Sequence, residues 1–323
     1  MEIKTFSEIV GQNYAVNFLK KVIQKKRLSH AYLFYGPKGV GKETSAYALI
    51  SGLFCKNPKN GEACKSCISC KKIIKNIHPD LKIIFPEKKE ILISQIRSIM
   101  EFIKYRPIEA PYQIILISPA EKMNKQAANA LLKSLEEPPP YTVFILISEN
   151  QSQLLPTITS RCQFVRFNPI PSEIIEEYLK NYYQFEPEVA KTISQISQGS
   201  IGMAINIAQK GLLEEVNAFI KACFSENWQT KFKIVERIAK LTTEDQDLFF
   251  FLLTMWIWKS YKQKILHKDV SLPACSDEFS LEKPYVIISQ ILKIKNNLQF
   301  YLSSELSFLH ILLFLEKHLQ KTK

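Results

Sequence analysis

The sequence predicts an α/β domain with a mainly parallel sheet, followed by two helical regions. Two observations lead to this fold class. Five short apolar stretches alternate with helical patterns in the first half of the 323-residue chain, an order typical of a parallel sheet covered by helices. From about residue 169 onward, apolar residues recur at helical spacing instead. A chain of this length can form two or three domains, each with its own core.

The sheet of the first domain is expected from five short apolar runs, and this domain ends near residue 168. Helical patterns over residues 45–54, 93–105 and 121–137 separate the runs. The fourth and fifth runs are joined by a polar stretch. The expected strands lie at residues 31–35, 80–85, 112–117, 143–148 and 163–167.

The second half of the chain divides into two expected helical domains. Residues 169–208 predict a small helical domain, in which Pro171 and Ser172 suit the entry to the first helix and Gly199 a break between later ones. Residues 209–323 predict an all-helical domain that ends in an amphipathic helix around 301–319. The large apolar face of this last domain indicates either a surface for a partner or its own core.

Composition excludes several classes of protein. Hydrophobic residues make up 46% of the chain and charged residues 23%, which is typical of a soluble globular protein rather than a disordered one. The amino-terminal MEIKTFSEIVGQ lacks the uninterrupted apolar core of a secretion signal. The most apolar run, LFFFLLTMWIW at 248–258, is well short of the ~20 residues that span a bilayer. We therefore expect a cytoplasmic protein without a membrane partner and a buried helix at this run.

The formal charge of +12 is unevenly distributed. Residues 1–210 carry 28 Lys and Arg against 18 acidic residues, whereas the rest of the chain is nearly balanced. A basic surface suits a partner that carries phosphates. A lysine-rich, solvated exterior explains the same charge without any partner.

A phosphate-binding loop is predicted at GPKGVGKETS, residues 36–45. The spacing G-x-x-x-x-G-K is present, an apolar run precedes the loop and a helical pattern follows it. In this setting backbone N–H groups and the positive helix end face an anion, and the lysine reaches the outer phosphates. Three of the nine glycines of the chain lie here, which makes a chance match improbable. The candidate nucleotide-binding residues are Gly36, Gly39, Gly41, Lys42 and Thr44.

Two departures argue against ATP hydrolysis. Glu43 stands where a Ser or Thr hydroxyl ordinarily binds Mg²⁺, and Thr44 cannot replace it because one step along a helix turns a side chain by about 100°. The apolar run at 112–117 is followed by Ser118 and Pro119, where an ATPase needs acidic residues. Glu121 comes several residues later and is expected to open the next helix. The loop is predicted to be poor at metal-assisted hydrolysis, so binding of ATP with Mg²⁺ is doubtful, whereas binding of a phosphate without hydrolysis stays open.

A metal site is predicted from the spacing C-x₈-C-x₂-C-x₂-C of Cys55, Cys64, Cys67 and Cys70. Two successive x₂ gaps allow the thiolates to converge on one tetrahedral ion, as structural zinc requires. Disulfides are disfavoured in a reducing cytosol. His78 is expected to be a loop residue rather than a ligand. A nucleic-acid-binding zinc ribbon is the alternative. It is supported by the basic residues of the segment that carries the four cysteines, here called the insert: Lys56, Lys59, Lys65, Lys71 and Lys72. Cys223 and Cys275 are expected to be ordinary core or surface thiols.

Four segments resemble bacterial DNA polymerase III clamp-loader subunits, which are AAA+ proteins. The resemblance runs in order over residues 6–205 and is carried by residues 6–42, the four-cysteine insert, NALLKSLEEPPPYTVFILIS at 129–148 and ITSRCQFVRF at 158–167. Of the kinds of subunit in this family, the chain is most similar to delta-prime, which has a degraded acidic strand and keeps the SRC sequence. The gamma/tau motor subunits keep a GKT or GKS loop and an Asp–Glu pair.

The resemblance implies an architecture and a set of partners. It implies an AAA+, RecA-like domain at 1–168 with a zinc module at 55–70, a helical lid at 169–208 and a helical collar at 209–323. The expected partners are gamma/tau and delta in a hetero-pentamer, with the sliding clamp and primed DNA reached through the complex. Structural zinc is supported, because members of the family carry a zinc module in this place.

Two further residues follow from the resemblance. Gly202, in GSIGMA, stands at the position of an arginine that contacts the γ-phosphate in active relatives. Arg161, in TSRC, is expected to serve in trans as an arginine finger at a neighbour's ATP site, since a guanidinium matches phosphate oxygens. A simple pair with a surface carboxylate is the alternative for Arg161. Two functions thus stay open: a non-motor scaffold subunit, and an ATP-hydrolysing motor of the gamma/tau kind.

Overall fold

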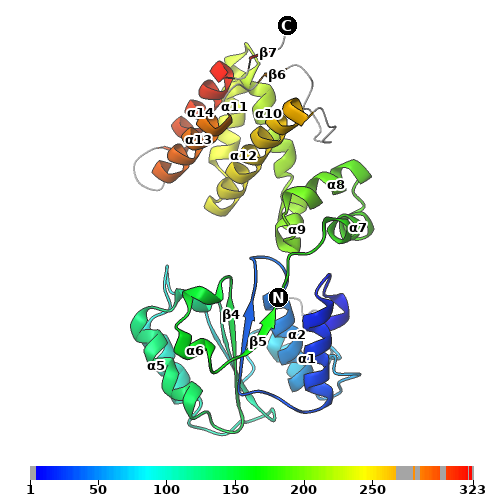
Figure 1. Ribbon diagram of the computed structural model, residues 1–323, viewed down its shortest axis with the longest axis vertical. Helices are drawn as coiled ribbons and strands as arrows, with labels where there is room; N and C mark the ends of the chain where they lie inside the picture. Colours follow the sequence, from blue (N-terminus) through cyan, green and yellow to red (C-terminus); the bar gives the residue numbers. More distant parts are fainter. Residues whose placement is uncertain (1–4, 267–278, 281–283, 299–302, 319, 322–323) are drawn as a thin grey trace. The chain divides into compact units, whose positions relative to one another are not determined.

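The computed structural model describes residues 5–266, 279–280, 284–298, 303–318 and 320–321. The chain divides into two compact units (Figure 1). The first comprises residues 1–174 and 198–202, and the second comprises 175–197 and 203–323. The finer division of the second half into a lid and a collar stays a prediction.

The first unit is built on a five-stranded parallel sheet with the strand order β2-β3-β4-β1-β5. All five strands predicted from the sequence are confirmed, and no strand end differs from its prediction by more than one residue. They are β1 (Ala31–Tyr35), β2 (Leu81–Ile84), β3 (Gln113–Ile117), β4 (Thr142–Ser148) and β5 (Gln163–Arg166).

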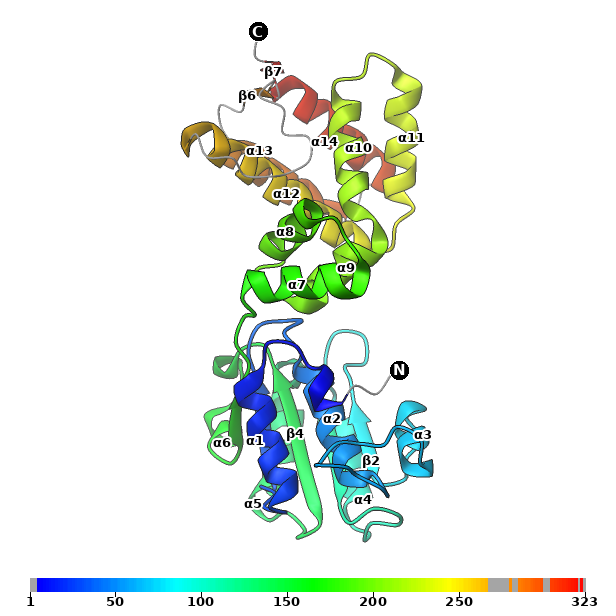
Figure 2. The ribbon, with the colours of Figure 1, turned by 90° about the vertical axis from the view of Figure 1, so that its right-hand side faces the viewer.

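Helices cover both faces of this sheet. One face packs against α1 and α2, and the opposite face against α4, α5 and α6 (Figures 1 and 2). The helices are α1 (Asn13–Gln24), α2 (Lys42–Phe54), α3 (Ile68–Ile74), α4 (Ile93–Phe102), α5 (Lys125–Glu136) and α6 (Pro156–Thr159), with short 3-10 helices η1 (Phe6–Glu8), η2 (Ala120–Lys122) and η3 (Gln151–Gln153).

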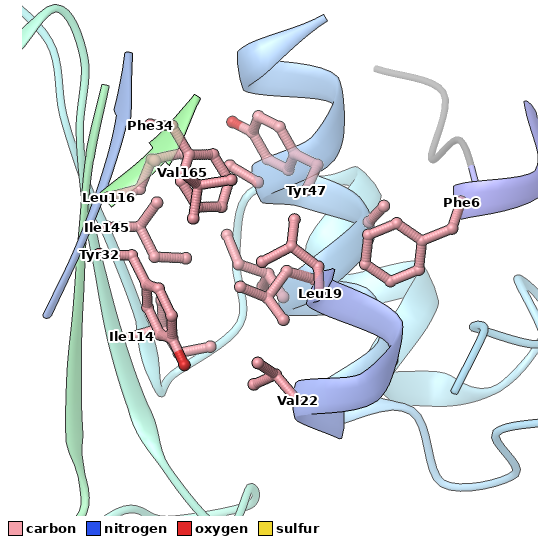
Figure 3. Packing of buried hydrophobic residues seen from close by; sticks show 14 of the residues in the cluster. Phe6, Leu19, Val22, Tyr32, Phe34, Tyr47, Ile114, Leu116, Ile145 and Val165 are labelled. Carbon is pink, nitrogen blue, oxygen red and sulfur yellow. The ribbon is translucent and has the colours of Figure 1, made fainter. Parts of the chain in front are cut away.

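Burial on both faces explains why the central strands are continuous apolar runs. Successive side chains of β1 point to opposite faces, so that Tyr32 joins the core beside α1 while Leu33 joins the core beside α4 and α5. Figure 3 shows Leu19 and Val22 of α1 pointing toward the sheet face that carries Tyr32 and Ile145. Every residue of β3 and β4 is buried.

Among its described residues, the second unit is helical apart from one short strand pair. Its core contains the rings of Phe219, Phe249 and Phe308, which meet edge to face. The run at 248–258 lies inside one long helix, as predicted; one face of it is buried, whereas Trp258 is exposed. No helix among the described residues is long and apolar enough to cross a membrane. The helices are α7 (Ser172–Tyr183, whose first turn belongs to the first unit), α8 (Pro187–Ile196), α9 (Ile201–Lys210, whose start belongs to the first unit), α10 (Leu212–Cys223), α11 (Trp228–Ala239), α12 (Thr243–Leu266), α13 (Pro284–Leu298) and α14 (Ser304–His318).

Two sequence predictions about these elements are wrong. The helix expected over 121–137 begins only at Lys125, because the side chain of Asn124 caps it by accepting from the N–H of Ala127 at 2.9 Å. Glu121 therefore lies in η2 and does not open this helix. Residues 209–323 are not helical throughout, since β6 (Phe279–Ser280) pairs with β7 (Gln320–Lys321).

The predicted ends and thiols of the last domain are only partly described. The final helix is confirmed as α14, but residues 301, 302 and 319 of its expected range lie outside the described residues. Cys275 also lies outside them. Cys223 is fully buried, which confirms a core thiol.

Candidate functional site

The predicted phosphate-binding loop, residues 36–45, lies where three parallel strands end together. The loop follows β1, while Ser118 follows β3 and Glu149 follows β4, and these strands are neighbours in the sheet. In open parallel sheets, ligands bind outside the carboxyl ends of the strands. Gly41 takes a left-handed conformation (φ 99°) that turns the chain into α2, so Lys42 is the first residue of that helix.

Lys42 is bound to its own loop. Its Nζ donates to the carbonyl oxygens of Gly36 and Pro37, both at 2.5 Å, and its side chain is buried. Burial lowers the pKa of Lys42, while the carboxylates of Glu149 and Glu121 oppose that shift. Loop carbonyls and carboxylates thus surround the ammonium group that would otherwise reach a phosphate.

Glu43 and Ser118, the two residues that depart from the ATPase pattern, contact each other. The Ser118 hydroxyl donates to Oε1 of Glu43 at 2.6 Å, a length typical of a charge-assisted O–H···O⁻ bond. Thr44 follows in the first turn of α2, one residue beyond Glu43. The bond connects the start of α2 to the end of β3.

The start of α9 also lies against the loop, within the same unit. The N–H of Gly202 donates to the carbonyl oxygen of Gly39 at 2.8 Å. A Cβ at Gly202 would come within 3.1 Å of the Gly39 Cα, which is tighter than ordinary contact. A Cβ at Gly36 would come within 2.1 Å of the Phe167 carbonyl oxygen. These positions therefore need glycine for close backbone approach.

The four cysteines of the insert converge. The Sγ atoms of Cys55, Cys64, Cys67 and Cys70 all lie within 4.8 Å of one another. Tetrahedral thiolates at the usual zinc–sulfur distance would stand about 3.8 Å apart, so the cluster could bind one metal ion with small adjustments. The partly buried ion pair between Lys20 and Glu62 connects the insert to α1.

Asp80 is a residue that the sequence analysis missed. It is fully buried, and its carboxylate accepts the backbone N–H groups of Ile108, Glu109 and Ala110 at 2.6, 2.7 and 2.8 Å. Its own N–H donates to Nδ1 of His78, which is buried in the loop before β2 and packs on the Phe54 ring. The sequence HPDL drew attention to His78, but only the fold brings Asp80 to a loop about thirty residues away.

We expect Asp80→Ala to lower the free energy of unfolding of the first unit by about 3 kcal/mol, because several backbone N–H groups would lose a charged acceptor. Asp80→Asn keeps one acceptor oxygen and should cost less. Glu101→Ala is the matched control, since Glu101 is exposed and pairs only with Lys104 three residues on. Chemical denaturation followed by circular dichroism measures all three. An Asp80→Ala protein as stable as the control would contradict this anchoring role.

Arg161 lies in the turn between α6 and β5. Its guanidinium pairs with Glu136 at the end of α5 at 2.8 Å and donates to the Thr157 carbonyl oxygen, also at 2.8 Å. The Arg161 side chain is 35% exposed and that of Glu136 is 48% exposed. The surface pair proposed as the alternative for Arg161 is therefore present in the single chain, and a pair this exposed is easily exchanged for another anion.

Comparisons with known proteins identify delta-prime, gamma and tau subunits of DNA polymerase III as relatives. A family model described as DNA polymerase III, delta subunit, matches residues 11–171. The chain is 33% identical over 261 residues to the DNA polymerase III subunit delta' of Bacillus subtilis, which covers 81% of this chain and 74% of that protein. It is 38% identical over 191 residues to the subunit delta' of Pseudomonas aeruginosa, and this alignment covers 58% of this chain and 58% of that protein.

A solved structure supports the fold. The crystal structure of a DNA polymerase III gamma subunit-related protein from Thermotoga maritima superposes with a TM-score of 0.51. The alignment covers 94% of this chain and 98% of that protein at 22% sequence identity. At this identity the similarity concerns the architecture alone.

Proposed function

The chain belongs to the family of DNA polymerase III delta-prime subunits and is a clamp-loader subunit, and on that premise we propose that it is the non-motor member of the complex. In this role it holds its place in the ring without hydrolysing ATP. It helps to load the sliding clamp onto primed DNA during replication.

The hydrogen bond between Ser118 and Glu43 carries this proposal. A motor subunit of this fold needs a hydroxyl on the loop and a carboxylate at the end of the second strand to hold Mg²⁺. Here the carboxylate is on the loop and the hydroxyl is at the strand end, 2.6 Å apart. Gly202 adds a further departure, since it offers no side chain to a γ-phosphate. The alternative of a gamma/tau-like motor is disfavoured for these reasons.

The partners of this chain are the other subunits of the clamp loader, gamma/tau and delta. We propose that they form a hetero-pentamer, in which the helical region 209–323 serves as the collar and residues 169–208 as the lid. The sliding clamp and primed DNA are reached through the assembled complex. The proposed location is the cytoplasm, at the replisome on the nucleoid.

The proposed metal of the cysteine cluster is one structural zinc ion, ligated by Cys55, Cys64, Cys67 and Cys70. A set of four thiols with the proximity described above suits zinc better than hard cations, which prefer oxygen ligands. Zinc would hold the polar segment between α2 and α3 in place. The nucleic-acid-binding ribbon is disfavoured because Lys72 is paired with Glu109 and Lys65 with Glu8.

The proposed catalytic contribution of the chain is Arg161, acting in trans as an arginine finger at the ATP site of a neighbouring subunit. Its guanidinium is permanently charged and offers planar donors that match phosphate oxygens. The exposed partner Glu136 can be exchanged for a phosphate at small cost.

The proposed function is tested by reconstitution. We expect the isolated chain to hydrolyse ATP at background rate. Adding it to gamma/tau and delta subunits of the same organism should complete a complex that loads the clamp onto primed DNA. Omitting it should abolish loading. ATP turnover by the isolated chain at the rate of the motor subunits, lost in Lys42→Ala, would overturn the non-motor role.

A further inference from the structure

The metal-holding pair of this fold has exchanged positions in this chain. In phosphate-loop NTPases, Mg²⁺ is held by a hydroxyl at the loop end and by an acid that follows a second strand of the sheet. Glu43 occupies the first place and Ser118 the second. One carboxylate and one hydroxyl are thus still present, each where the other is expected.

Glu43 and Ser118 are hydrogen-bonded to each other. The bond between the Ser118 hydroxyl and Oε1 of Glu43 spans 75 positions of sequence and is partly buried. The carboxyl group of Glu43 at the loop end also lies on the side of the loop where the β- and γ-phosphates of a nucleotide would bind, next to anionic oxygens. The pair therefore occupies the metal position and repels the anion next to it.

Two further sets of hydrogen bonds hold polar groups of the same loop. Lys42 is bound by the carbonyl oxygens of Gly36 and Pro37, and the Gly39 carbonyl oxygen accepts the N–H of Gly202. The carboxylates of Glu121 and Glu149 lie near enough to Lys42 to stabilise its charge. The ammonium group of Lys42 and the carbonyl oxygen of Gly39 therefore have hydrogen-bond partners within the chain. These residues do not fit a magnesium–nucleotide complex.

We propose that the hydrogen bond between Glu43 and Ser118, called the catch below, prevents the loop from binding a magnesium–nucleotide complex. A metal-dependent nucleotide site should return only when both residues are replaced together. This inference deepens the proposed absence of ATP turnover and rests on it. A change at one position is insufficient because each partner alone supplies half of the metal-holding pair. Ser118→Asp alone would also place two carboxylates in contact, which destabilises both.

Binding of a fluorescent ATP analogue to the isolated chain, with and without Mg²⁺, tests the catch. The wild-type chain and the single variants Glu43→Ser and Ser118→Asp should show no gain in affinity from Mg²⁺. The double variant E43S/S118D should gain roughly tenfold or more, the effect of one added charge-assisted contact. Adding Lys42→Ala to the double variant should remove the binding. Turnover should stay absent, because Pro119 occupies the place of the second acid.

Two results would overturn the proposal. One is a folded double variant, verified by circular dichroism, that binds no better with Mg²⁺ than without it. The other needs no variant to fold: a wild-type chain whose affinity for the analogue rises with Mg²⁺, and loses that rise in Glu43→Gln, would make Glu43 a metal ligand rather than part of a catch. Binding without turnover would leave the non-motor role intact, whereas turnover by the wild-type chain would end both proposals.

Discussion

Replacing Arg161 by alanine should leave assembly of the complex intact and strongly lower ATP turnover at the one site that faces this chain. An arginine supplied in trans can raise turnover by a factor of about 10³ to 10⁵, because it stabilises charge that develops in the transition state. In the proposed ring, only the site that faces this chain would lose its arginine. DNA-stimulated turnover and clamp loading by the whole complex should therefore fall partly rather than vanish.

Glu136 provides the control that separates the two roles of Arg161. If Arg161 serves only the surface pair with Glu136, then Glu136→Gln should reproduce the loss seen in Arg161→Ala. If Arg161 acts on a neighbour's phosphate, Glu136→Gln should leave turnover and loading near the wild-type rate. Arg161→Lys keeps the charge but lacks the planar donors, so it should recover only part of the activity.

The measurement is DNA-stimulated ATP hydrolysis and clamp loading by complexes reconstituted with each variant. Size-exclusion chromatography verifies assembly in each case. Thermal denaturation of the isolated chains should show a small change for both Arg161→Ala and Glu136→Gln, since an exposed pair contributes at most about 1 kcal/mol. A fully assembled Arg161→Ala complex that loads clamps at the normal rate would rule out the role in trans.

Removing two cysteines of the cluster should produce the second large effect. We expect the wild-type chain, purified without chelator, to contain about one equivalent of zinc. The variant C67S/C70S should contain almost none, and the segment between α2 and α3 should lose its structure. Structural zinc contributes about 10–16 kcal/mol to the folding of zinc-finger peptides, far more than the exposed ion pair between Lys65 and Glu8 contributes in this segment.

Cys223→Ala is the matched control for the zinc prediction. Cys223 is also a buried thiol, but it lies in α10, in the other unit, so its loss should not change the zinc content. Metal analysis and hydrogen exchange of residues 55–77 measure the two expected effects separately. Zinc content that is near zero in the wild type, or unchanged in C67S/C70S, would remove the claim.

The sequence by itself determined those features that depend on residues close together in the chain. The strands of the parallel sheet are continuous apolar runs because helices bury both of their faces, and such runs are visible without a structure. The cysteine cluster was predictable for a similar reason, since the two-residue gaps between Cys64, Cys67 and Cys70 bring three thiols together within seven residues. The family was also visible, because its signature segments are themselves short and continuous.

The start of α5 shows where local patterns fail. The helical pattern extends back to Glu121, yet the helix begins at Lys125 because Asn124 caps it with its side chain. Periodicity reports which face is buried, whereas a helix end depends on which group satisfies the free N–H groups of the first turn.

Only the tertiary structure decided what the unusual residues do. Glu43 and Ser118 were visible as two separate departures from an ATPase, but their hydrogen bond requires β3 and the loop helix to lie side by side. Asp80 was not noticed at all, because the backbone groups that it binds come from a distant loop. The physical reason is common to both. Hydrogen bonds between residues far apart in sequence depend on the packing of whole elements, and no local pattern records which buried polar groups that packing will bring into contact.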